Sequence, residues 1–148
     1  MSIKKSCIVI ILLALSALSV TAQTQLTADE FESKVSGSQQ VQLIDVRTAA
    51  EYQDGHLKSS KNVDYKSPDF KEQIKGFDKT KPVYVYCLSG ARSALASKAL
   101  VENGFGPVYE LKGGYLKWSS SGKDGKLVTR KNGMMEEKDF RALLDSSL

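Results

Sequence analysis

Apolar and polar positions divide this chain into short segments of two alternating kinds. Residues 41–46 and 83–86 are compact apolar runs rich in β-branched and aromatic side chains, which is typical of buried strands. Residues 107–111 form a third such run, and a brief strand is also predicted at residues 62–64. Segments with helical spacing separate these runs. Alternating strands and helices predict an α/β fold with a largely parallel central sheet.

Two of the predicted helices begin with a capping box. Residues 27–30 and 48–51 each place a threonine three positions before a glutamate, so that each side chain can bond the other residue's backbone amide. The first helix is expected to bury Phe31 and Val35 and to end near Gly37. The second is expected to be short.

Two further helices are predicted later in the chain. Ser67 and Pro68 suit the cap and first position of a helix that continues through residue 74. Residues 92–103 have helical spacing, with Gly104 as the expected C-terminal cap. The apolar positions of this last helix are Leu95, Ala96, Ala99 and Leu100.

The candidate chemistry lies where the run at residues 83–86 ends. Cys87 follows that strand, a turn containing Gly90 comes next, and the helix begins at Arg92. Converging backbone amides, a helix N-terminus and a cationic side chain all favour a thiolate. We therefore interpret Cys87 as a nucleophile. The alternative is a buried structural cysteine at the end of a strand.

The N-terminal 22 residues have the pattern of a secretory signal peptide. Lys4 and Lys5 precede an apolar stretch from Ile8 to Val20, and small residues follow up to Ala22. We expect cleavage before Gln23 and an exported protein, either periplasmic or secreted. An uncleaved membrane anchor is the alternative, but the apolar stretch is shorter than the roughly 20 residues that span a bilayer.

Cleavage changes the charge and the cysteine count. The whole chain has a net charge of +4, and without Lys4 and Lys5 the remainder has 19 basic and 17 acidic residues, a net charge of +2. This balance is too mild to indicate a nucleic-acid partner. Removal of Cys7 leaves Cys87 without a disulfide partner in the same chain, which in an exported protein indicates a reactive thiol or intermolecular chemistry.

The last thirty residues differ from the preceding chain. Residues 119–133 are polar and contain several glycines, so they are expected to form a linker. Residues 134–148 regain helical spacing and are expected to form a terminal helix that packs on the domain.

With these motifs, the chain resembles the rhodanese-like family of single-domain sulfurtransferases over residues 26–118. Residues 43–57 resemble the entry motif of the family and residues 113–118 its closing motif. Residues 87–93 resemble its active-site loop. The resemblance implies a three-layer α/β/α domain at residues 23–118 with no cofactor.

The resemblance also implies roles for individual residues. Cys87 would accept a sulfane sulfur as a persulfide and pass it to cyanide or to another thiol, which is chemistry that a thiol of low pKa can perform. Asp45 and Arg47 would belong to the supporting framework. The substrate-binding loop would comprise Leu88, Ser89, Gly90, Ala91, Arg92 and Ser93.

Loop length favours sulfur over phosphate as the transferred group. Arg92 follows Cys87 by five positions, whereas related phosphatases have one more residue between cysteine and arginine. His56 is the only histidine, and the family implies a structural position for it. With a single histidine and one cysteine after cleavage, no metal site is expected.

Three functions remain as alternatives. The first is an exported sulfurtransferase with a small sulfur donor, a cyanide or thiol acceptor and a possible protein thiol partner, but with no membrane anchor after cleavage. The second is a non-catalytic rhodanese-like module that binds a partner protein. The third is a thiol redox or phosphatase-like enzyme, which the missing second cysteine and the loop length make less favourable.

Overall fold

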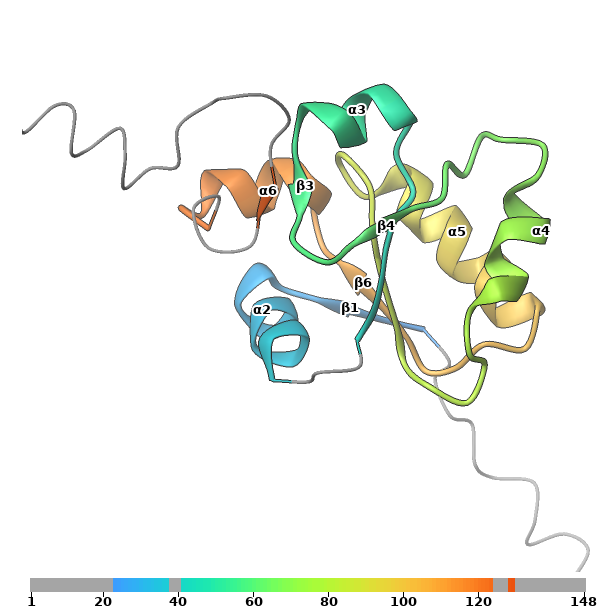
Figure 1. The fold of residues 1–148 in the computed structure, drawn as a ribbon. Helices are drawn as coiled ribbons and strands as arrows, with labels where there is room; N and C mark the ends of the chain where they lie inside the picture. Colours follow the sequence, from blue (N-terminus) through green and yellow to red (C-terminus); the bar gives the residue numbers. More distant parts are fainter. Residues whose placement is uncertain (1–22, 38–40, 124–127, 130–148) are drawn as a thin grey trace, which may run out of the picture.

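A central parallel sheet organises the molecule (Figure 1). The computed structural model describes residues 23–37, 41–123 and 128–129. Five strands lie in the order β1-β6-β5-β2-β4, and all neighbouring pairs are parallel. Their bounds are Gln23–Leu26 for β1, Gln42–Asp45 for β2, Lys61–Asn62 for β4, Val83–Tyr86 for β5 and Val108–Leu111 for β6.

Helices cover both faces of the sheet, as the alternation of strands and helices predicted (Figure 1). Side chains alternate along each strand, so Val83 and Val85 of β5 face one layer while Tyr84 and Tyr86 face the other. The first layer contains α4 (Phe70–Gln73), the 3₁₀ turn η1 (Ile74–Gly76) and α5 (Ala91–Glu102). The second contains α2 (Ala28–Ser36) and α6 (Gly114–Ser120).

Both predicted capping boxes are present. Thr27 caps α2 and Thr48 caps α3 (Ala49–Asp54), and in each box the glutamate three residues later bonds the backbone amide of the threonine. Helix α2 ends at Gly37 and buries Phe31 completely, as expected. These local signals therefore placed both helix starts correctly.

Helix α4 begins later than its sequence predicted. The cap lies at Asp69, and Ser67 bonds the Asp69 carboxylate through its hydroxyl instead of capping a backbone amide. The Ser67 hydroxyl therefore does not cap the helix, which starts at Phe70. Only one turn of α-helix forms before the chain tightens into η1.

Helix α5 buries Ala96 and Leu100 of its four expected apolar positions and partly buries Ala99, but it exposes Leu95. Leu95 is 54% exposed, and the buried positions are Ser93, Ala96, Ser97 and Leu100. Small residues let the helix lie close to the sheet, so two serines occupy positions that an apolar pattern does not identify. At the C-terminal end, Gly104 has the left-handed conformation expected of a capping glycine.

A second, two-stranded sheet joins β3 (His56–Leu57) to β7 (Val128–Thr129) in antiparallel register. Strand β7 falls inside the segment interpreted as a linker, and its pairing returns the chain to the domain.

The expected signal peptide at residues 1–22 and terminal helix at residues 134–148 lie outside the described residues. None of the helices described is long and apolar enough to cross a membrane.

Candidate active site

Cys87 lies at the carboxyl end of β5, the central strand of the parallel sheet. Ligands of open α/β sheets bind at this end of the strands. The side chain points to the layer that contains α5 and is 1% exposed. The Cys87 side chain is therefore enclosed by the domain.

The turn after Cys87 directs backbone amides at the sulfur. The Gly90 amide donates a hydrogen bond to Cys87 Sγ over 3.1 Å. Gly90 has φ +108°, a conformation that glycine adopts without the strain of a side chain, and it is the N-terminal cap of α5, which begins at Ala91. The positive end of a twelve-residue helix thus adjoins the thiol, as the strand–turn–helix pattern predicted.

This environment lowers the pKa of the Cys87 thiol below its ordinary value. Burial, the largest effect, acts in the opposite direction and raises the pKa. The hydrogen bonds that outweigh it come from the Ser93 hydroxyl and from the backbone amides of Ser93, Gly90 and Ser89. A thiol held in this way forms its nucleophilic thiolate more readily.

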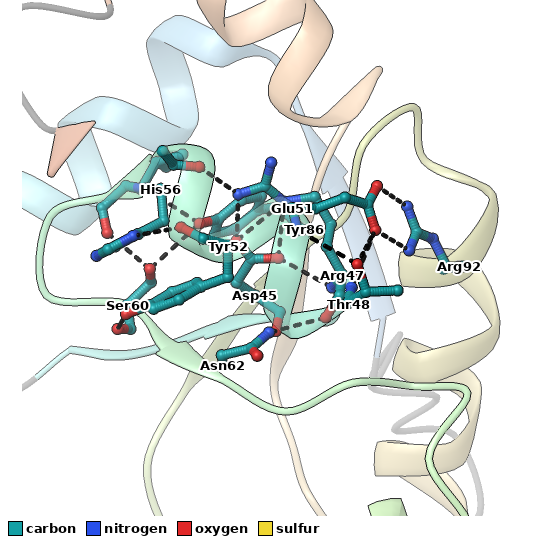
Figure 2. Close-up of polar contacts among 12 residues, drawn as sticks. Asp45, Arg47, Thr48, Glu51, Tyr52, His56, Ser60, Asn62, Tyr86 and Arg92 are labelled. Carbon is teal, nitrogen blue, oxygen red and sulfur yellow. Dashed lines mark hydrogen bonds and ion pairs between the residues drawn. The ribbon is translucent and has the colours of Figure 1, made fainter. Parts of the chain in front are cut away.

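Arg92 does not offer a free positive charge to the thiol. Its guanidinium donates two hydrogen bonds of 2.7 Å to the two carboxylate oxygens of Glu51 in α3 (Figure 2). The Arg92 bonds are the largest cause that lowers the pKa of Glu51 to about 2; burial opposes them, and bonds from Thr48 assist them. The expected cationic group is present, but a carboxylate on α3 partly neutralises it.

The motif at residues 113–118 closes over the cysteine loop. The Tyr115 amide donates to the carbonyl oxygen of Cys87 over 2.8 Å, and the Leu116 amide donates to that of Leu88 over 3.0 Å. A Cβ atom on Gly114 would lie 2.5 Å from the Cys87 carbonyl oxygen. Only glycine permits this approach, which explains why glycine occupies position 114.

A buried ion pair supports the site from β2. Arg47 contacts the Asp45 carboxylate over 2.6 Å (Figure 2). It also donates to the Gly55 carbonyl over 2.7 Å and lies 4.4 Å from the centre of the Tyr115 ring. Both charged side chains are almost completely buried. The pair joins β2, α3 and the start of α6, which is the framework role that the resemblance implied.

His56 belongs to the same framework. Its Nδ1 donates to the Tyr52 carbonyl over 2.8 Å, and its ring stacks on that of Tyr52 at 3.6 Å between centroids (Figure 2). These contacts hold the short β3 strand against α3. Across the described ranges, no group of three or more potential metal ligands is found.

The predicted loop residues occupy different surroundings. Leu88 and Arg92 are partly buried, Ser89 and Ala91 are exposed, and Ser93 is completely buried. Ser93 Oγ donates to the carboxylate of Glu110 on β6, a residue that the sequence pattern did not single out. Glu51, Glu110 and Gly114 therefore join the site through contacts between distant segments.

The fold and the site together define an α/β protein with a hydrogen-bonded cysteine at the carboxyl end of the central strand of a parallel sheet. The chain belongs to the family described as the rhodanese-like domain, whose model matches residues 27–121. The central sheet and its surrounding helices are those of the rhodanese fold.

Individual relatives agree with this assignment. The chain is 36% identical over 106 residues to the uncharacterized protein YqhL of Bacillus subtilis, covering 72% of this chain and 76% of that one. It is 37% identical over 89 residues to thiosulfate sulfurtransferase 16 of Arabidopsis thaliana, covering 53% and 74%. A solved rhodanese-like domain protein from Staphylococcus aureus is similar with a TM-score of 0.60 and 29% identity, covering 70% and 95%.

Proposed function

We propose that this protein is a sulfurtransferase in which Cys87 accepts a sulfane sulfur and passes it to a thiophilic acceptor. The observation that carries the proposal is the 3.1 Å hydrogen bond from the Gly90 amide to Cys87 Sγ at the start of α5. An amide and a helix N-terminus directed at one sulfur atom stabilise a thiolate, and they stabilise the persulfide anion that replaces it. The similarity to a thiosulfate sulfurtransferase supports the same reaction.

The reaction balances with thiosulfate as donor. The Cys87 thiolate attacks the sulfane sulfur of thiosulfate, a new sulfur–sulfur bond forms, and sulfite leaves with the electron pair of the bond that breaks. A cyanide ion then attacks the terminal sulfur of the persulfide. Thiocyanate leaves and the Cys87 thiolate is regenerated. A thiolate acceptor would follow the same course and carry the sulfur away as its own persulfide.

Intact-mass measurement tests this proposal. Incubation of the full chain with thiosulfate should add the mass of one sulfur atom, and cyanide should remove it. C87S should gain no sulfur, whereas C7S, the matched control at the other cysteine of the chain, should gain it as the parent does. A parent protein that gains no sulfur from thiosulfate or from a small persulfide would contradict the proposal.

A phosphatase is the second candidate, since a solved protein from Rhodopseudomonas palustris described as a possible tyrosine phosphatase has a TM-score of 0.54 and 29% identity. The spacing of five positions between Cys87 and Arg92 makes this candidate weaker, and the pairing of Arg92 with Glu51 leaves less positive charge for a phosphate. Turnover of an aryl phosphate that C87S abolishes would favour the phosphatase.

A binding module without catalysis is the third candidate. Retention of Cys87, with a pKa lowered by its hydrogen bonds, favours catalysis over binding alone. A relative named tRNA uridine(34) hydroxylase from Cytophaga hutchinsonii is 41% identical over 81 residues, but the chain spans 26% of that protein. This match therefore supports the domain and does not support the hydroxylase activity.

The proposal includes export through the signal-like segment at residues 1–22. The partners would be a small sulfur donor, a cyanide or thiol acceptor, and a thiol of another protein where the acceptor is a protein. No nucleic acid and no lasting membrane anchor form part of the proposal.

A further inference from the structure

Leu116 is an exposed apolar residue that lies beside the cysteine loop. Among the described residues it is one of two large hydrophobic side chains that are exposed, and 55% of its surface is open to solvent. It belongs to the first turn of α6, and its backbone amide donates to the carbonyl oxygen of Leu88 over 3.0 Å. The Leu88 side chain is itself only partly buried. Single exposed leucines are common on proteins, but this one is joined to the residue that follows Cys87.

Positive charge accompanies this leucine without negative charge to balance it. Lys112 and Lys117 are exposed, and neither forms an ion pair with another described residue. A Cβ atom on Gly113 would lie 2.8 Å from Lys117 Cβ, so the two lysines come from one tight turn. Lys123 is bound by two acidic side chains of α2. No acidic residue occurs in the sequence from 111 to 123, so the charges at the start of α6 are uncompensated.

The reaction with small molecules does not need such a surface. Thiosulfate and cyanide have no apolar groups, and they require only the sulfur atom and the amides around it. A protein acceptor must bring its thiol to a sulfur atom that the domain encloses, so it has to bind the surface around the cysteine loop. Protein interfaces combine apolar side chains at the centre of the contact with complementary charges around them.

We propose that Leu88, Leu116, Lys112 and Lys117 form the docking surface for a protein that carries the acceptor thiol. The matching surface of this partner contains apolar side chains, which cover Leu116, and acidic side chains, which pair with the two lysines. The thiolate of the partner attacks the terminal sulfur of the Cys87 persulfide, the bond between the two sulfur atoms breaks, and the Cys87 thiolate is regenerated. The partner leaves as a persulfide. This inference deepens the proposed function and rests on it.

Synthetic peptides test the charge of the partner. One peptide has a central cysteine, a leucine on either side of it and acidic residues at both ends, and the comparison peptide has lysines in place of the acidic residues. Sulfur transfer to each peptide is measured with the full chain and with thiosulfate as donor. The value of kcat/KM should be about tenfold higher for the acidic peptide, and this preference should fall as salt is added. Equal transfer to both peptides would overturn the proposal.

L116S tests the apolar contact, because it shortens the side chain but keeps the backbone amide that bonds Leu88. We expect the ratio of kcat/KM for the acidic peptide to kcat/KM for cyanide to fall about tenfold, mainly through a higher KM for the peptide. L95S is the matched control, since Leu95 is 54% exposed but lies in the second turn of α5. It should keep the ratio of the parent. An equal ratio in L116S and L95S would contradict the docking surface.

The double variant K112Q/K117Q supplies a second measurement. It should bring the rates for the acidic and the lysine peptide close to equality, whereas K98Q, at an exposed lysine of α5, should keep the preference of the parent. Faster transfer to the peptide in L116S would show that another part of this chain or a second copy covers the surface. Binding to phosphatidylglycerol vesicles that K112Q/K117Q abolishes, without a preference for the acidic peptide, would assign the surface to a membrane. Either result would overturn the proposal.

Peptide binding separates this inference from the proposed function. An analogue of the acidic peptide with serine in place of cysteine accepts no sulfur, and its binding can be measured by fluorescence anisotropy of a labelled sample. Suppose that the analogue binds the parent and that L116S weakens this binding, in a protein that gains no sulfur from any donor. That result would retain the docking surface and overturn the proposed function. Sulfur transfer to cyanide without a preference between the peptides would do the reverse.

Discussion

The Tyr115 amide donates a 2.8 Å hydrogen bond to the carbonyl oxygen of Cys87, so the first turn of α6 fixes the backbone at Cys87. Gly114 makes this contact possible because the chain passes too close to Cys87 for a side chain. The geometry of the thiol therefore depends on a segment that contains none of the reactive groups.

G114A should displace the cysteine loop. The added methyl would lie 2.5 Å from the Cys87 carbonyl oxygen, and the left-handed backbone at φ +61° would itself cost about 1–2 kcal/mol. We expect a loss of stability larger than this backbone cost, measured by urea unfolding, and slower alkylation of Cys87. G122A is the matched control, because Gly122 also has positive φ but no atom within 4 Å of its added methyl. Equal effects of the two substitutions would show that the contact with Cys87 is unimportant.

R92A and E51Q should change sulfur transfer from thiosulfate in opposite directions. Loss of Arg92 removes a cation next to the site, and we expect kcat/KM to fall about tenfold to a hundredfold. Loss of the Glu51 charge frees the guanidinium to attract the anionic donor, so kcat/KM should rise several-fold at low salt and less at high salt. E72Q, which alters an exposed ion pair with Lys75, is the control. A fall in both variants would show that the pair acts only by holding α3 against α5.

The Glu51–Arg92 pair should also give stability a specific pH dependence. Glu51 has its pKa lowered from 4.5 to about 2, so its contribution is complete above pH 4.5 and is lost as the pH falls toward 2. The difference in free energy of unfolding between parent and E51Q should be on the order of 1–3 kcal/mol at neutral pH. It should shrink through this acid range. Other carboxyl groups with lowered pKa values are present in both proteins and do not affect this comparison. A difference in free energy of unfolding that stays constant through the acid range would therefore contradict the assignment to Glu51.

The exported protein should begin at Gln23. Cleavage there would remove the apolar stretch and Cys7 but leave β1 complete, because this strand begins at Gln23. N-terminal sequencing of protein recovered after export provides the measurement. Recovery of material that begins at Met1 and stays bound to membranes would replace the soluble exported form with an anchored one.

Local patterns predicted much of this structure, because capping, strand runs and turns depend on neighbouring residues. The two capping boxes and the passage from β5 through Gly90 to α5 follow from such patterns. The contacts of Ser93 with Glu110, of Arg92 with Glu51 and of Gly114 with Cys87 join segments that only the tertiary fold brings together. A buried serine also resembles an exposed one in sequence, which explains why the apolar pattern found Ala96 and Leu100 but missed Ser93 and Ser97 on the buried face of α5.

The position of β1 has a consequence for how the protein folds. This strand opens the described chain, yet its partner in the main sheet is β6, with Gln23 opposite Val108 and Leu26 opposite Leu111. The edge strand β1 therefore cannot pair with β6 until almost the whole domain is available. Such distant pairings slow folding, because the chain must lose the entropy of closing a long loop before the stabilising contacts between the strands can form. A chain that emerges gradually, from a ribosome or through a membrane, carries Cys87 before it can build the surroundings that lower the pKa of the thiol.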